Sequence, residues 1–175
     1  MKFIPATKNQ INDFISFAKT GKLEKLKRSI DGGMNVLVDD AKAFIFSARY
    51  GQKESLELLI VHLIEVEKTN VLRHCLLEAC AYNQRDIVDY LIENHLNYLE
   101  ADEMEENVLK SCIIGGSNDM LLYLSAKHEF KITKELLDWV LKNDYNEAYL
   151  KLEIILLNQK YSNKIVNKNK ETIKI

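Results

Sequence analysis

The chain has 175 residues, 47% of them hydrophobic, and a formal net charge of −2. This is enough apolar sequence for one domain with a buried core, so the composition excludes global disorder. The near-neutral charge argues against a protein that binds nucleic acid along its whole surface. With 1 proline and 6 glycines, the sequence lacks the turn residues of a β-sandwich or β-barrel.

The three cysteines, Cys75, Cys80 and Cys112, are an odd number, which favours free thiols in a reducing compartment over a disulfide framework. The opening segment M-K-F-I-P-A-T-K-N-Q has no apolar stretch long enough for a signal peptide. The longest apolar run, residues 58–64, is interrupted by His62 and is far too short to span a membrane. We therefore expect a cytoplasmic protein without membrane contact.

One short phrase recurs along the chain: a small residue, two variable residues, a glycine, and an acid three residues later. It reads A-K-T-G-K-L-E at 18–24, A-R-Y-G-Q-K-E at 48–54, C-A-Y-N-Q-R-D at 80–86 and I-I-G-G-S-N-D at 113–119. We call the residue in the glycine position the anchor; the four anchors are Gly21, Gly51, Asn83 and Gly116. Successive anchors are thus 30, 32 and 33 residues apart, a period that predicts stacked structural repeats.

Each anchor lies between two stretches with helical periodicity. A first helix is expected upstream of each anchor, over residues 11–18, 43–48, 72–81 and 108–114. A second helix is expected just past it, where an acid three residues on favours a helix amino terminus and an aliphatic residue five residues on starts a buried stripe. The anchor itself should take a positive φ to end the first helix, which glycine does freely and asparagine tolerates.

The phrase at residues 18–36, A-K-T-G-K-L-E-K-L-K-R-S-I-D-G-G-M-N-V, and that at 78–97, E-A-C-A-Y-N-Q-R-D-I-V-D-Y-L-I-E-N-H-L-N, resemble the ankyrin repeat family. The resemblance covers roughly residues 11–130. It implies an all-α fold, a short solenoid of stacked helix-turn-helix repeats with about four or five units over residues 1–159. No copy carries the family's T-P-L-H motif, so we expect looser loops, and we expect the second helix after residue 60 to run long because the family's G-A pair is missing there.

The carboxy-terminal part reads as a last, degenerate repeat that caps the array. Residues 134–141 and 146–159 predict two more helices, and Asp144 falls in the anchor position because Glu147 follows three residues later. Residues 160–175 form a tail rich in lysine and asparagine, which we expect to be a frayed helix or disordered.

The sequence contains no recognisable group of catalytic or metal-binding residues. The four histidines have no paired spacing with carboxylates or cysteines, and His95 and His128 fall where the family has a turn glycine. Cys75 and Cys80 lie five residues apart on a helix, a poor arrangement for one zinc ion. We expect no enzyme activity, no catalytic residue, no metal and no cofactor.

The resemblance places partner contacts at the two variable positions before each anchor. There the chain carries Arg49, Tyr50 and Tyr82, residue types that often anchor protein interfaces. We expect them side by side in a concave groove; the alternative is that Tyr50 and Tyr82 only pack on each other between repeats.

A second candidate contact is the acidic segment of residues 99–107, L-E-A-D-E-M-E-E-N, with Asp102, Glu103 and Glu106 as its candidate contact residues. The family's pattern makes it a loop tip. Its charge disfavours nucleic acid and favours a partner with a basic patch, and a merely solvated loop is the alternative.

These features predict a non-enzymatic protein-interaction module that inhibits or recruits a protein partner. The richness in lysine, asparagine and isoleucine is typical of an AT-rich genome, which would suit a viral or phage inhibitor or an effector of an intracellular bacterium. The alternative function is a sensor or sequestering protein that binds a small ligand or peptide in the groove. The sequence does not indicate whether the protein is a monomer or an oligomer.

Overall fold

The computed structural model describes residues 6–95, 102–128 and 130–172. Within these residues all regular structure is helical, which confirms the all-α prediction. In chain order the helices are α1 Lys8–Lys19, α2 Leu23–Asp31, α3 Val38–Arg49, α4 Lys53–Val61, α5 Glu65–Ala81, α6 Arg85–His95, α7 Asp102–Ile114, α8 Asn118–Lys127, α9 Lys134–Lys142 and α10 Asn146–Thr172.

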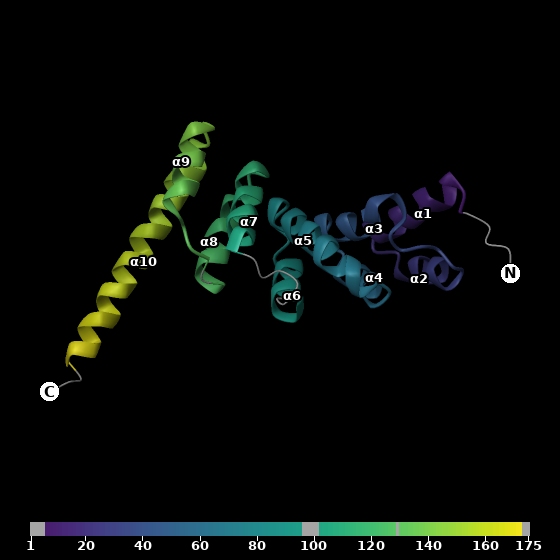
Figure 1. The fold of residues 1–175 in the computed structure, drawn as a ribbon, viewed down its shortest axis with the longest axis horizontal. Coiled ribbons are helices and arrows are strands. Elements are labelled where there is room, and N and C mark those ends of the chain that lie inside the picture. Colours follow the sequence, from purple (N-terminus) through teal and green to yellow (C-terminus); the bar gives the residue numbers. More distant parts are fainter. Residues whose placement is uncertain (1–5, 96–101, 129, 173–175) are drawn as a thin grey trace.

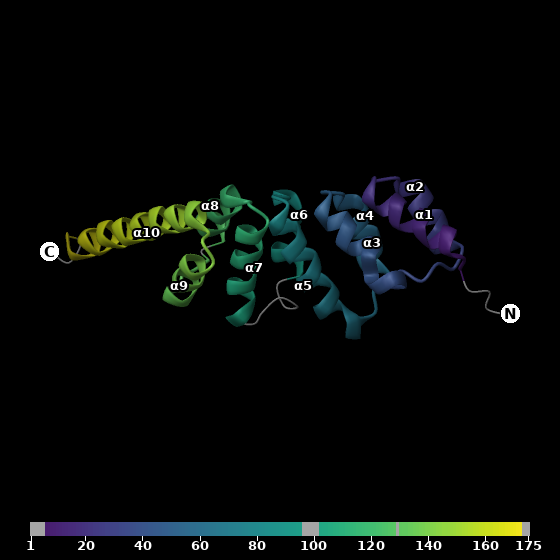
Figure 2. The same cartoon turned by 90° about the horizontal axis from the view of Figure 1, so that it is seen from above.

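The helices are stacked in two rows along one long axis, with the two chain ends at opposite ends of the array (Figure 1). Helices α1, α3, α5 and α7 form one row, in which each packs on the next, and α2 packs on α4 in the other row. Figure 2 shows the same order from above, with α9 and α10 closing the carboxy-terminal end. A single cluster of buried apolar side chains runs through the stack.

The helix pairs are joined by the same turn at all four anchors. The φ angles are 66° at Gly21, 67° at Gly51, 57° at Asn83 and 70° at Gly116. In each turn the anchor N–H donates to the carbonyl three residues back, and the next N–H donates to the carbonyl five residues back, as in Gln52 to Ser47 at 2.8 Å. These two bonds satisfy carbonyls that the end of a helix otherwise leaves without partners.

Asp144 repeats this geometry at the last helix pair. Its φ is 60°, and Tyr145 N–H donates to the carbonyl of Val140 at 3.1 Å. The predicted fifth anchor is therefore confirmed.

Two predicted boundaries are wrong. The long helix between the second and third anchors is α5, not α4: α4 ends at Val61, and α5 begins at Glu65. Glu65 and Glu67 lie in the first turn of α5, where the helix dipole favours acids. The residues before 72 therefore lengthen the first helix of the third repeat instead of the second helix of the second repeat. From Asp102 on, the acidic segment is not a loop tip, because α7 starts there; residues 99–101 lie outside the described residues. The helix dipole again accounts for acids at a helix start.

The tail shows no break in secondary structure at residue 160. Helix α10 continues from the predicted last repeat to Thr172, so the chain remains helical across the predicted boundary.

Neighbouring repeats are also joined by side chains that follow the anchors. Gln84 Nε2 donates to the carbonyl of Arg49 at 3.0 Å, and Ser117 Oγ donates to the carbonyl of Ala81 at 2.6 Å. In both cases the residue after one anchor caps the helix that ends at the previous anchor. A Cβ atom on Gly51 would overlap Oε1 of Gln84, so the same contact favours glycine at that anchor.

Gly51→Ala and Gly116→Ala should therefore differ in cost. Both introduce a side chain at positive φ, which costs about 1 kcal/mol of unfolding free energy. At Gly116 no atom of the described residues lies within 4 Å of the new Cβ. At Gly51 the new methyl group also displaces Gln84 from its hydrogen bond, which adds about 1 kcal/mol. Denaturant unfolding measures both costs; equal losses would show that the Gln84 bond contributes nothing.

Candidate partner-binding groove

A groove of about 740 Å³ runs between the carboxy-terminal halves of α3, α5 and α7. Its lining includes Ile45, Arg49, His74, Glu78, Tyr82 and Ile114. It continues into a second hollow of about 310 Å³ nearer the start of α3, since Ile45 and His74 line both. The row of first helices therefore carries a continuous depression that crosses three repeats.

Arg49 is held in place by two neighbours from the next repeat. Its Nε donates to Glu78 at 2.8 Å, and its Cζ lies 4.9 Å from the ring centre of Tyr82. The hydrogen bond that Arg49 donates to Glu78 raises the pKa of Arg49 further above its ordinary value. Much of its charge is thus engaged within the protein, so Arg49 orients Tyr82 as well as facing the groove.

Tyr50 has the same relation to the repeat before it. Lys19 Nζ lies 4.6 Å from the Tyr50 ring centre, a contact of the same kind as that of Arg49 with Tyr82. The residue two positions before one anchor therefore covers the tyrosine that precedes the next anchor. Such cation–π contacts contribute about 0.5–1 kcal/mol each at exposed sites.

The structure brings Arg49 and Tyr82 together, as predicted, and places Tyr50 beside Lys19, one repeat toward the amino terminus. The tyrosines remain open to solvent on their other faces: Tyr50 is 43% exposed and Tyr82 51%. Ile114, which occupies in the fourth repeat the position that Arg49 has in the second, is 65% exposed. Each ring lies beside a cation of the preceding repeat, and Tyr50 also meets Phe46 of its own helix edge-on, with ring centres 6.2 Å apart. The mutual stacking of Tyr50 and Tyr82 considered from sequence therefore does not account for their positions.

The part of the acidic segment that the structure describes begins at Asp102, at the other end of α7 from the groove. Twelve residues separate Asp102 from Ile114, about 18 Å along a helix. Glu106 pairs with Lys110 at 2.5 Å, and Glu105 accepts the Lys131 N–H at 3.4 Å. The side chains of Asp102 and Glu103 lie outside the described residues. The structure thus does not join the two predicted contact regions into one patch.

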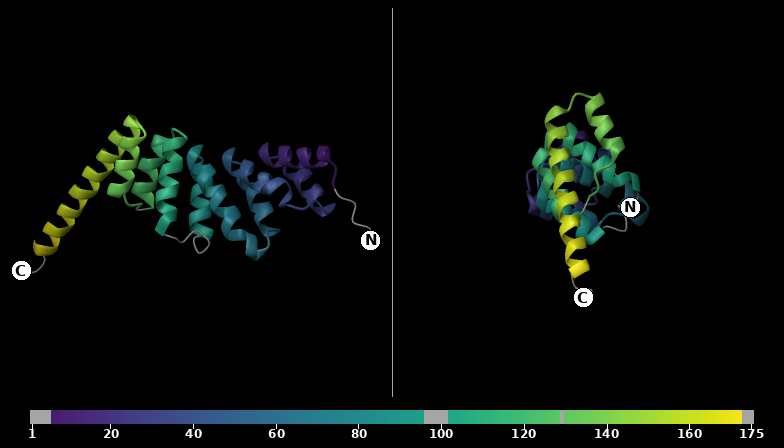
Figure 3. Two further views of the ribbon diagram at one scale, coloured as in Figure 1. Left: turned by 45° about the horizontal axis from the view of Figure 1, so that its top comes forward. Right: turned by 90° about the vertical axis from the view of Figure 1, so that its left-hand side faces the viewer.

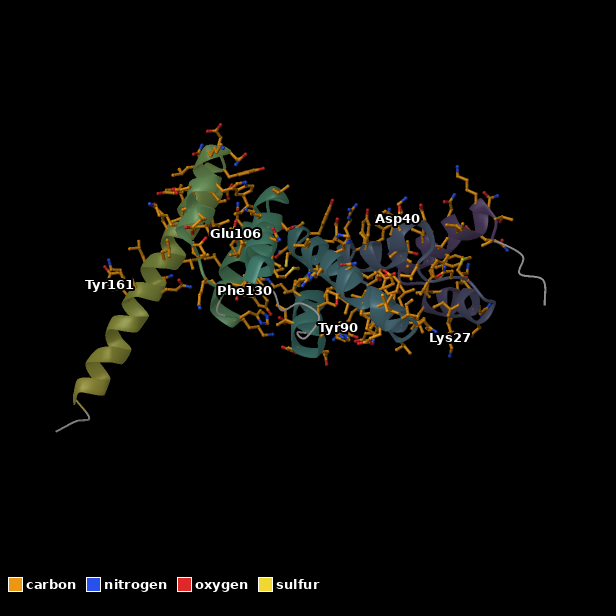
Figure 4. The ribbon with its side chains drawn as sticks, in the orientation of Figure 1. Lys27, Asp40, Tyr90, Glu106, Phe130 and Tyr161 are labelled. Carbon is orange, nitrogen blue, oxygen red and sulfur yellow. The ribbon has the colours of Figure 1, made fainter. Side chains whose placement is uncertain are left out.

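A strained turn at the edge of the groove was not foreseen from the sequence. Asp39, Asp40 and Ala41 have φ angles of 53°, 55° and 58°, although each left-handed residue costs about 1–2 kcal/mol. Figure 4 shows Asp40 on the α3 side of the array, where it and Ala41 line the smaller hollow. The only signal for this turn in the sequence is the pair of aspartates, because aspartate adopts a positive φ more readily than most residues.

The other row of helices holds a polar cluster centred on Asp89 of α6. Its carboxylate accepts Tyr123 Oη at 2.5 Å and pairs with Lys127 Nζ at 2.6 Å and His128 Nε2 at 2.9 Å. Burial opposes ionisation of Asp89, but the hydrogen bonds from Lys127, Tyr123 and His128 outweigh it, so the pKa of Asp89 lies below its ordinary value. The cluster ties α6 to α8, which gives His128 the structural role expected of it.

The cysteines are placed as small core residues. Cys75, Cys80 and Cys112 are free and buried, and burial raises the pKa of the Cys75 and Cys80 thiols. In the described part of the chain no three His, Cys, Asp or Glu side chains are arranged to hold a metal ion. None of the helices in those ranges is long and apolar enough to cross a membrane.

No protein-family model matches the sequence, and neither the search of curated proteins nor the search of solved structures found a match. The assignment of a function therefore depends on the repeats and the groove themselves.

The stability contributed by Asp89 should disappear in acid. Because its folded pKa is lowered, the contribution is complete above its unfolded pKa of about 3.9 and is lost as the pH falls through the folded value. Asp89→Asn should reduce the unfolding free energy by about 1–2 kcal/mol at pH 7, and the difference from the wild type should shrink at acidic pH. Asp13→Asn, at an exposed position of α1, serves as the control; an equal loss at both sites would contradict the role of the cluster.

Proposed function

We propose that this chain is a non-enzymatic, ankyrin-like interaction module that binds a segment of a protein partner in the groove between α3, α5 and α7. The observation that carries the proposal is the Arg49–Tyr82 pair, which is fixed by Glu78 yet leaves half of the tyrosine exposed beside Ile114. The ankyrin-like assignment is supported by five equivalent turns, four at the repeat period of 30 to 33 residues and the last, at Asp144, 28 residues after Gly116.

The groove has the composition of an interface. Tyrosine and arginine are enriched among residues that dominate binding energy, and exposed Ile114 and Tyr82 gain from burial that the folded chain does not provide. Because Arg49 already holds the Tyr82 ring, binding costs little side-chain entropy. A partner that fits would insert an apolar side chain against Tyr82 and Ile114 and offer polar groups to Arg49 and Glu78.

The partner in this proposal is a protein that the chain inhibits or recruits, on behalf of a virus, a phage or an intracellular bacterium. We propose the cytoplasm as the compartment, because three buried free thiols suit a reducing environment. The groove volume of about 740 Å³ also falls in the range of small-ligand sites, which keeps the sensor function as the second candidate.

Affinity capture from lysate of the source cells or their hosts, read by mass spectrometry, tests the proposal with Tyr82→Ala as the paired bait. A true partner should bind the Tyr82→Ala variant about 30-fold more weakly, the effect of removing a central interface tyrosine. Tyr90→Ala is the matched control, because Lys53 Nζ lies 5.5 Å from the Tyr90 ring centre in the same kind of contact, but in the other row of helices (Figure 4).

Thermal unfolding of both variants separates binding from stability. Since Tyr82 is half exposed, its truncation should lower stability by less than about 1 kcal/mol. Normal binding by Tyr82→Ala would exclude the groove. A nucleotide or metabolite that stabilises the wild type but not Tyr82→Ala would favour the sensor function instead.

The acidic start of α7 should act on the rate of association. Replacing Asp102, Glu103 and Glu106 with Asn, Gln and Gln should slow binding of a basic partner more than it speeds release, because long-range attraction acts mainly before contact. Added salt should slow the wild type in the same way. The control neutralises Asp13, Glu24 and Glu54, exposed acids with the same charge at the amino-terminal end. Stopped-flow or biosensor kinetics would contradict the prediction if both triple variants behaved alike.

A further inference from the structure

Helix α10 has two apolar faces, and only one of them is covered. Ala148, Leu152 and Ile155 are buried, on the side that packs against α8 and α9. The other face carries four exposed apolar residues whose exposed fractions are 60% at Leu150, 48% at Ile154, 52% at Leu157 and 62% at Tyr161. We call these four residues the α10 stripe.

The α10 stripe has the spacing of a helix-pairing seam. Its members are four, three and four residues apart, the pattern of alternating a and d positions in a coiled coil. Its first and last members are 11 positions apart, about 16 Å along the helix. A single exposed leucine needs no explanation, but a continuous apolar row on one face marks an interaction surface.

The α10 stripe lies at the end of the array. Seen end-on, α10 lies in front of the stack and faces outward (Figure 3, right), and the side chain of Tyr161 points away from the other helices (Figure 4). Repeat arrays normally end in a helix with a polar outer face. Helix α10 therefore covers the preceding core, as a cap should, but presents a new apolar surface in place of a polar one.

We propose that the α10 stripe is a homodimer interface, in which α10 of a second copy of this chain packs antiparallel against it. A twofold axis between Ile154 and Leu157 brings Ile154 opposite the partner's Leu157 and Leu150 opposite the partner's Tyr161. All four members of the α10 stripe are then covered by the same four residues of the other copy, as a twofold interface requires.

The charges beside the α10 stripe favour this partner and this direction. Glu153 and Lys160 are exposed and lie seven residues apart, so they flank the seam on the same side. In an antiparallel pair Glu153 faces the partner's Lys160, and the twofold axis repeats the contact. In a parallel pair Glu153 would lie nearest the partner's uncharged Asn158 and would gain no ion pair, and an unrelated partner would need no such internal complementarity.

Sedimentation velocity over a concentration series tests the interface in the full chain. The wild type should show a monomer–dimer equilibrium, and Ile154→Glu should raise the dimer dissociation constant at least about 30-fold, as expected for a central interface residue. Helicity measured by circular dichroism should not change, because Ile154 is half exposed. The matched control is Val66→Glu, an exposed valine of α5 that is 84% accessible; it should dimerise normally.

A charge exchange tests the direction of pairing. Glu153→Lys and Lys160→Glu should each weaken the dimer, and the double variant should restore it, because opposite charges face each other again. Chains that carry Leu150→Cys should form disulfides readily with chains that carry Tyr161→Cys and poorly with themselves. A wild type that stays monomeric at every soluble concentration, a dimer unaffected by Ile154→Glu, or single charge variants without effect would each overturn the proposal.

Discussion

The whole array depends on how each first helix ends. A helix that must reverse within three residues leaves carbonyls without partners and requires one residue at positive φ. At each of the five turns, one residue with φ between 57° and 70° supplies the reversal, and two backbone hydrogen bonds close it. Because all five turns have the same geometry, each second helix leaves in the same direction, and the helix pairs can stack side by side.

The turn also sets which side chains cross between repeats. The residue after an anchor points back to the preceding helix end, as Gln84 does to the carbonyl of Arg49. The residues before an anchor point into the row of first helices, where Arg49 meets Tyr82. The groove is therefore a consequence of the turns. Several of the side chains that line it lie at the ends of the first helices, where a substitution disturbs the packed core least.

The two proposed contact surfaces differ in kind. The groove crosses the middle of the array, has charged and aromatic groups that are already oriented, and therefore suits selective binding of a protein segment. The α10 stripe lies at one end, is apolar and self-complementary, and suits a second copy. Since the two surfaces are far apart in the array (Figure 1), a dimer would leave both grooves accessible and could bind two partners or two segments of one.

The sequence alone was sufficient for the helical class, the four anchors and Asp144, because each of these depends on residues within about five positions of one another. The repeat period followed from the recurrence of that local pattern along the chain. It also pointed to Arg49 and Tyr82 as neighbours, since equivalent positions in stacked repeats must lie close. Only the tertiary structure decided the contacts between residues 29 to 39 positions apart, such as Arg49 with Glu78 and Asp89 with His128. Those contacts depend on the angle at which repeats stack, which no local pattern encodes. The same holds for the acidic residues, which the sequence placed in a loop and the structure places in α7 from Asp102 on, and for the exposed face of α10.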